Sequence, residues 1–96
     1  MQRYIYTASL PDDLPANLLE QLTLAEARAG QGVVAMQAEQ LQDAARLKRW
    51  YGDGTWVKMR HTKHSMKGVI VIHYFRNIDT GHNVGFKFKR RLVAND

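Results

Sequence analysis

The chain has 96 residues, a length that allows one domain with a single hydrophobic core and excludes two. The absence of cysteine excludes disulfide bonds, thiol nucleophiles and thiolate metal sites. No uninterrupted apolar run exceeds four residues and no secretory leader opens the sequence, so we expect no membrane span in this domain.

The net charge of +5 is divided unevenly along the chain. Residues 1–53 carry five Lys or Arg against seven Asp or Glu, whereas residues 54–96 carry nine against two. All four histidines also lie in the second half, at positions 61, 64, 73 and 82. This asymmetry indicates a basic half that binds polyanions and a nearly neutral half that supports it. On charge alone, an ordinary solvated basic face is an equally good interpretation.

The beginning of the chain predicts an extended segment followed by helix. Residues 3–8 favour the extended segment, which residues 11–13 end with turn chemistry. Apolar residues then recur at helical spacing, namely Leu18, Leu19, Leu22 and Ala25. Thr23 and Glu26 have the spacing of a capping box, so we expect this helix to break and restart at Thr23. We expect it to end at the glycines within residues 30–32.

Residues 33–50 also predict helix, because they are rich in Ala, Gln, Leu, Glu and Arg. Four apolar side chains can share one stripe there, namely Val34, Ala38, Leu41 and Ala45. Asp43 can cap a second helical start over residues 44–51. The glycines within residues 52–54 end that helix.

Beyond Gly54 the apolar pattern changes to period two, which is typical of strands. Three such runs predict an antiparallel meander, over residues 56–61, 69–77 and 84–90. The predicted fold is therefore α+β, a single domain over residues 1–96. Its helical part, residues 12–51, is expected to pack on one face of a sheet over residues 55–91.

The turn between the last two strands determines the expected register. Residues 79–82 have strong turn propensity, and we place the turn centre at Thr80 and Gly81. The expected pairs are Phe75 with Phe86, His73 with Phe88, Tyr74 with Lys87, and Ile72 with Lys89. One face of the sheet is then apolar and contacts the helices. The other is expected to present to solvent Tyr74, Arg76, Lys87 and Lys89.

Several kinds of catalytic site lack the residues they need. His61 and His64 stand three residues apart, but a zinc site usually recruits Cys or an acidic ligand, and only Asp79 is a candidate. The acids lie mainly in the helical half, which leaves no carboxylate pair for glycoside hydrolysis. No nucleophile elbow, phosphate-binding glycine loop or dinucleotide fingerprint is present. We therefore expect neither a metal nor a cofactor.

The remaining groups suit cleavage of RNA through the 2′-hydroxyl. That reaction needs a base, an acid and cations that stabilise the phosphorane, and histidine, lysine and arginine supply these near neutral pH. Tyr51, Trp56 or Tyr74 could stack on an unpaired base. His73 alternates with apolar residues, so it is either a buried core histidine or a cleft residue. His61 lies at a strand end, where exposure is easier.

The order of several short motifs resembles a known family. Residues 22–30 read Leu-Thr-Leu-Ala-Glu-Ala-Arg-Ala-Gly, and residues 51–61 read Tyr-Gly-Asp-Gly-Thr-Trp-Val-Lys-Met-Arg-His. Residues 72–77 read Ile-His-Tyr-Phe-Arg-Asn, with a Thr-Gly at 80–81, and residues 86–89 read Phe-Lys-Phe-Lys. Together they resemble the C-terminal toxin domains of contact-dependent growth inhibition proteins (CdiA) and related polymorphic toxins. The resemblance covers residues 15–90.

The resemblance implies a fold, an activity and partners. Many such domains are ribonucleases, often of tRNA, and several have the small fold of helices and antiparallel sheet shared by barnase, EndoU and RelE. Each forms the C-terminal part of a surface-exported bacterial protein, acts in the cytoplasm of a neighbouring cell and is neutralised by a cognate immunity protein, which should be acidic here. The motif positions suited to catalysis are His61, His73, Tyr74, Lys87 and Lys89. The side chains expected to bind RNA are Lys58, Arg60, Lys63, His64, Arg76 and Arg90.

Three functional hypotheses follow. The leading one is a metal-independent ribonuclease toxin, with tRNA as the favoured substrate. The alternative is a non-catalytic module that binds nucleic acid through its basic sheet. A third class, an interaction domain that uses the apolar helical half, would have no affinity for RNA.

Overall fold

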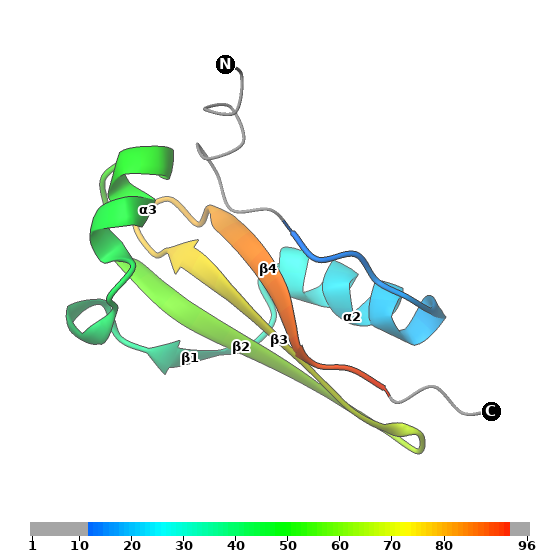
Figure 1. Cartoon of the computed structure of the whole chain (residues 1–96). Coiled ribbons are helices and arrows are strands. Elements are labelled where there is room, and N and C mark those ends of the chain that lie inside the picture. The colour runs from blue at the N-terminus through cyan, green and yellow to red at the C-terminus, as the bar shows by residue number, and fades with distance from the viewer. Residues whose placement is uncertain (1–11, 93–96) are drawn as a thin grey trace.

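The computed structural model describes residues 12–92, so the extended segment expected at residues 3–8 lies outside the described residues. The elements in chain order are α2 (Leu18–Arg28), β1 (Val33–Met36), the 3₁₀-helix η1 (Ala38–Gln40), α3 (Ala44–Tyr51), β2 (Trp56–Ser65), β3 (Gly68–Asn77) and β4 (Asn83–Arg90) (Figure 1). The described strands form one antiparallel sheet in the order β1-β2-β3-β4. The α+β class and the three expected strands are therefore confirmed. No helix within residues 12–92 is long and apolar enough to cross a membrane.

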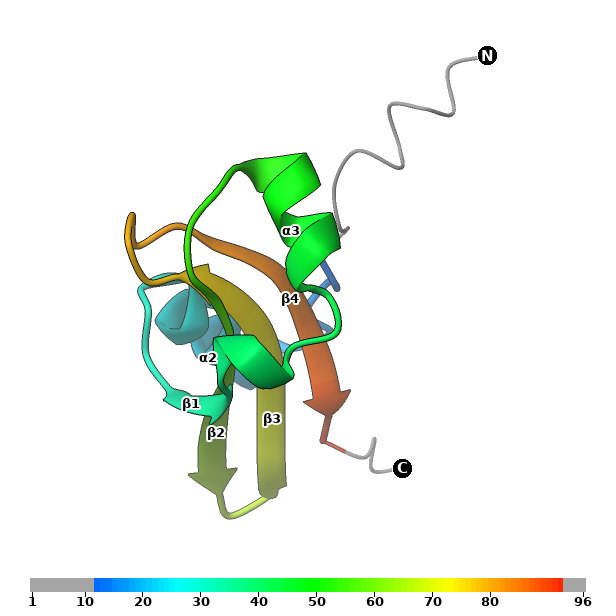
Figure 2. The same ribbon diagram turned by 90° about the vertical axis from the view of Figure 1, so that its left-hand side faces the viewer.

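Helices α2 and α3 cover opposite faces of the sheet (Figure 2). Trp56 and Val57 of β2 point to opposite sides, because successive side chains of a strand alternate. Val57 belongs to a hydrophobic core with Leu24 of α2, whereas Trp56 belongs to a second core with Leu47 of α3. We call these two sides of the sheet the α2 face and the α3 face. The prediction that the helices share one face is wrong, because β1 pairs at the sheet edge and carries the chain from one face to the other.

Helix α2 is continuous, so the break predicted at Thr23 is wrong. Asn17 is the N-cap, and its side chain accepts a hydrogen bond from the backbone N–H of Glu20 (2.8 Å). The Glu20 carboxylate accepts a second bond, from the backbone N–H of Ala16 (2.9 Å). The bond to Asn17 satisfies a donor that the first helical turn leaves free, and the bond from Ala16 fixes the chain that enters the helix. The Thr23 hydroxyl donates to the Leu19 carbonyl (2.7 Å) within the helix and caps nothing.

The buried stripe of α2 differs from the leucine stripe seen in the sequence. The residues that it buries are Glu20, Thr23, Leu24 and Ala27. Leu18 and Leu22, by contrast, are 78% and 49% exposed. Glu20 is only 1% exposed, and its carboxylate accepts a hydrogen bond from the guanidinium of Arg91 (2.6 Å). This ion pair allows a charged residue to occupy the inner side of the helix.

Residues 33–36 form strand β1 and not the predicted helix. Gly30, with φ of 94°, ends α2 in a left-handed conformation that favours glycine. The chain then becomes extended, and Val33 pairs with Arg60 along an edge of β2. The open edge of β2 and the β-branched side chain of Val33 outweigh the helical composition of the residues that follow.

Helix α3 spans the predicted residues 44–51 and follows Asp43, as expected. The Asp43 side chain forms an ion pair with Arg46 and makes no capping hydrogen bond to the backbone. Leu47 is buried in the core that contains Trp56. Because Trp56 begins β2, the helix rests on that end of the sheet.

Strands β3 and β4 pair in a different register from the predicted one. Arg76 is the partner of Asn83, so the connection comprises residues 78–82 and not a two-residue turn. Gly85, with φ of 70°, lies where the register shifts. The four expected pairs are therefore wrong. The observed pairs include Phe75 with Val84, His73 with Lys87, and Ile72 with Phe88.

Tyr74 and Arg76 point to the α2 face, so the prediction that they face solvent is wrong. The buried ring of Tyr74 stacks on Phe86, with 4.9 Å between centroids, and its hydroxyl donates to the Gln31 carbonyl (2.7 Å). The guanidinium of Arg76 donates to the Gly30 carbonyl. Through these hydrogen bonds, both side chains link the C-terminal end of α2 to the sheet.

Candidate nucleic-acid interface

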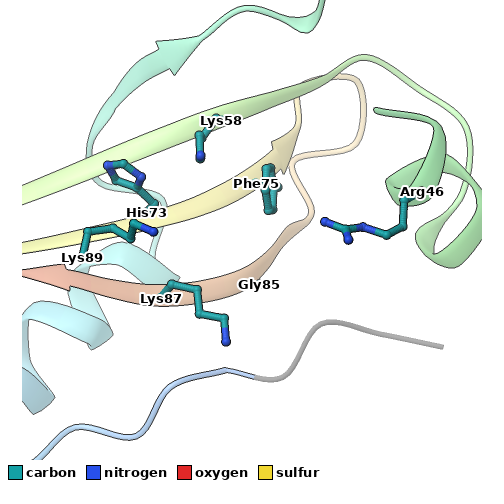
Figure 3. A pocket seen from close by; sticks show the side chains of 7 residues that line it. All are labelled: Arg46, Lys58, His73, Phe75, Gly85, Lys87 and Lys89. Atoms are coloured by element: carbon teal, nitrogen blue, oxygen red, sulfur yellow. The ribbon is translucent and has the colours of Figure 1, made fainter. Parts of the chain in front are cut away.

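The part of the α3 face that the helix leaves open forms a pocket of about 180 Å³ (Figure 3). Strands β2, β3 and β4 line it, and α3 contributes a side chain from one end. We call it the basic pocket, and its lining residues are Arg46, Lys58, His73, Phe75, Gly85, Lys87 and Lys89. Four of these described side chains are cationic and none is acidic. The basic pocket is therefore suited to an anion.

The imidazole of His73 lies among cationic neighbours. Its partners across the sheet are Arg60 on β2 and Lys87 on β4. Burial lowers the pKa of His73 below its usual value of 6.5. The charges of Lys58, Lys89 and Arg60 lower this pKa further. The imidazole is therefore neutral near pH 7, and its buried Nδ1 has no hydrogen-bond partner among the described residues.

Two aspartates that precede α2 close the outer edge of β4, and one of them, Asp13, also contacts Lys87. The Asp13 N–H donates to the Phe86 carbonyl (2.9 Å), and the Asp13 carboxylate accepts from the Phe88 N–H (2.9 Å). The Asp12 carboxylate accepts from the Phe86 N–H (3.0 Å). The Lys87 ammonium lies 3.4 Å from the Asp13 carboxylate. Burial raises the pKa of Asp13, but the bond from Phe88 and the charge of Lys87 more than offset this, and the net pKa is lowered.

Three of the five expected catalytic residues, His73, Lys87 and Lys89, meet in the basic pocket. His73 is therefore a cleft residue and not a core histidine. Its position follows from its pairing with Lys87, which directs both side chains to the α3 face. The other two expected catalytic residues lie on the opposite side of the sheet.

His61 and Lys63 lie on the α2 face, together with Tyr74 and Arg76. One carboxylate oxygen of Glu26 lies 2.8 Å from His61 Nε2, and the other accepts a hydrogen bond from the Lys63 ammonium (2.7 Å). The bond from Lys63, followed by that from His61, lowers the pKa of Glu26. This cluster ties α2 to β2, and the sheet separates it from the basic pocket.

The other residues expected to bind RNA fall into two groups, one at or beside the basic pocket and one nearer the β2–β3 hairpin. Lys58 lines the basic pocket, and Arg60 is the β2 partner of His73. His64 and Arg90 are exposed further toward the β2–β3 hairpin, opposite residues 69 and 71 of β3. These two side chains could extend a basic surface beyond the pocket.

Sequence reasoning did not identify Arg46, which lies in the half of the chain that is nearly neutral. Arg46 extends from α3 toward Phe75 (Figure 3). Its guanidinium lies over the ring of Trp50, 5.2 Å from the centroid. The sequence does contain a signal for this pair: Arg46 and Trp50 lie four residues apart on a predicted helix, and residues with that spacing are neighbours on the helix surface.

Two of the three aromatic residues expected to stack on a base are buried in the cores. Trp56 is 1% exposed and its indole N–H donates to the Gly52 carbonyl (3.0 Å). Tyr74 is covered by α2. Tyr51, the third, packs beside Trp56 and His82, with ring centroids 5.9 and 6.0 Å away.

Comparisons with protein-family models, with curated proteins and with solved structures found no match to this chain. Within residues 12–92, no three His, Asp or Glu side chains cluster in a way that could hold a metal ion. The function is therefore inferred from the chemistry of the basic pocket.

Proposed function

We propose that this chain is a bacterial ribonuclease toxin domain that cleaves RNA through the 2′-hydroxyl without a metal. The observation that carries the proposal is the position of His73 in a pocket lined by four cations, where its buried Nδ1 has no hydrogen-bond partner among the described residues. The lowered pKa of His73 supports it, because a lowered pKa favours the neutral imidazole. A base that is neutral at pH 7 beside groups that bind phosphate is the combination that this reaction requires.

The proposed reaction is an in-line displacement at phosphorus. His73 accepts the proton of the 2′-hydroxyl, and the 2′-oxygen forms a bond to the phosphorus. The bond from phosphorus to the 5′-oxygen breaks, and a lysine ammonium of the basic pocket, from Lys87 or Lys89, protonates the leaving oxygen. The products are a 2′,3′-cyclic phosphate and a 5′-hydroxyl. The remaining cations stabilise the charge that develops on the phosphorane oxygens.

The resemblance to CdiA-type toxin domains extends the proposal to the biological setting. We propose a barnase/EndoU/RelE-like fold as the finer classification. The α+β class and the antiparallel sheet support it, whereas the placement of the two helices on opposite faces does not. The domain would form the C-terminal part of an exported protein and act on RNA, with tRNA favoured, in the cytoplasm of a target cell. An acidic immunity protein would neutralise it by covering the basic pocket.

Cleavage of total RNA in EDTA tests the proposed activity. We expect the wild type to cleave and His73→Gln to be slower by about 10²- to 10⁴-fold, the usual effect of losing a general base. His82→Gln is the matched control, because it removes an exposed histidine that lies outside the basic pocket and is not among the residues expected to bind RNA. Equal cleavage by wild type and His73→Gln would show that His73 is not the base.

A non-catalytic module that binds nucleic acid is the second candidate. One observation favours it: among the described residues, His73 is the one histidine in the basic pocket, so no second imidazole is available as the acid. The cations alone would bind phosphate, with an affinity that falls steeply as salt rises. Salt-dependent RNA binding with no cleavage, and no growth arrest on expression, would select this candidate.

A further inference from the structure

Helix α3 carries a half-buried aromatic side chain next to the basic pocket. Trp50 lies one helical turn after Arg46, so both project from the same flank of the helix. The guanidinium of Arg46 covers the indole ring at 5.2 Å, and the same Arg46 side chain lines the basic pocket. The side chain of Arg46 therefore connects the Trp50 indole ring to the basic pocket.

Arg46 has hydrogen-bonding capacity that the fold does not use. Its terminal amino group pairs with Asp43, but its Nε is buried and has no hydrogen-bond partner among the described residues. A guanidinium over an indole ring offers a planar cation that can stack on a base and donate to phosphate. The pair therefore has the features of a binding surface for an unpaired nucleotide.

The fold does not employ Trp50 as a core residue. The core beneath α3 is formed by Leu47 with Trp56, Phe75 and their neighbours, and Trp50 belongs to neither of the two cores. It keeps part of its surface in solvent. Tryptophan is the largest apolar side chain, so leaving it at a pocket rim exposes apolar area that a ligand could cover.

We propose that Trp50 and Arg46 form a subsite for an unpaired nucleobase next to the phosphate bound in the basic pocket. This subsite rests on the proposed function in one respect, namely that the basic pocket binds nucleic acid. The substrate would be an RNA that is single-stranded where it contacts the site. The base stacks on the Trp50–Arg46 pair. The lysines hold the adjoining phosphate.

Tryptophan fluorescence provides a direct test, because the chain contains two tryptophans and Trp56 is buried. The ligands are a short 2′-O-methyl oligonucleotide, which cannot be cleaved through its 2′-oxygen, and inorganic polyphosphate, which has the charge but no base. We expect the oligonucleotide to quench Trp50 emission and polyphosphate to bind with little quenching. Trp56→Phe should preserve the quenching signal, which assigns the signal to Trp50.

Affinity measurements on Trp50 variants complete the test. Stacking on one base corresponds to a loss of roughly five- to 150-fold in affinity when the aromatic ring is removed. We expect Trp50→Ala and Trp50→Leu to lose that much affinity for the oligonucleotide while binding polyphosphate as the wild type does. Trp50→Phe should keep most of the affinity. Trp50→Leu retains an apolar contact, so it separates loss of stacking from loss of folding.

Each result bears on the proposal separately from the nuclease activity. Unchanged oligonucleotide affinity in Trp50→Leu, or an equal loss for polyphosphate, would overturn the base subsite even if the protein cleaves RNA. A selective loss of oligonucleotide affinity in a protein that cleaves no RNA would support the subsite and refute the ribonuclease assignment. Failure of the wild type to bind the oligonucleotide would overturn the subsite, whereas the ribonuclease assignment is decided by the cleavage assay on unmodified RNA.

Discussion

The orientation of α2 can be tested with two leucines that lie two residues apart on the same helix. Leu24 is 6% exposed and belongs to the core beneath α2, whereas Leu22 is 49% exposed. Leu→Ala has the same effect on helix propensity at both positions, so the difference between the variants reports burial. We expect Leu24→Ala to lower the free energy of unfolding by about 2–4 kcal/mol and Leu22→Ala by less than about 1 kcal/mol.

The assay is urea unfolding followed by circular dichroism, supported by thermal melts. For a chain of this length a loss of about 3 kcal/mol corresponds to a drop of roughly 12–24 °C in Tm. Since small domains are stabilised by only about 5–15 kcal/mol, the Leu24 variant should be clearly weakened but still folded. Equal losses in the two variants, or a larger loss in Leu22→Ala, would mean that the helix buries the leucine stripe suggested by the sequence.

Three further predictions concern individual side chains. Because the pKa of His73 is lowered in the folded protein, the unfolded chain binds more protons below the usual value of 6.5. The free energy of unfolding, measured in urea, should therefore fall as the pH drops from about 7 through 6. In His73→Gln the fall should be smaller, because the contribution of His73 is absent. Arg91→Met should cost about 2–3 kcal/mol in the same assay, because it leaves the buried Glu20 carboxylate without its cation. Tyr74→Phe should cost about 1–2 kcal/mol by leaving the Gln31 carbonyl unpaired, yet initial rates of RNA cleavage should not change, since Tyr74 lies behind the sheet.

The period-two pattern beyond Gly54 was enough to predict the three long strands, because alternation follows directly from the geometry of a strand. The same alternation placed Lys87 and Lys89 on one face. Strand β1 could not be predicted in this way. Its four residues lie in a segment of helical composition, and they become extended because an edge of β2 is available to pair with them.

The errors at the site have a common origin in long-range geometry. Tyr74 was assigned to the basic face because it was expected to pair with Lys87. The longer connection at residues 78–82 and the bulge at Gly85 shift the register, so that His73 pairs with Lys87 instead. The role of Arg46 depends on where α3 packs, which no local pattern specifies. Local sequence therefore identified the kinds of residue in the pocket, and only the fold showed which of them meet.

The central claim, that His73 in the basic pocket cleaves RNA through the 2′-hydroxyl, is tested most directly by the ends of the product. A purified tRNA is incubated with the domain in EDTA, and the new termini are identified by mass spectrometry. We predict a 2′,3′-cyclic phosphate and a 5′-hydroxyl, formed at similar rates by the wild type and by His61→Gln and about 10²- to 10⁴-fold more slowly by His73→Gln. Termini with a 5′-phosphate, or the same products formed by His73→Gln at the wild-type rate, would contradict the claim.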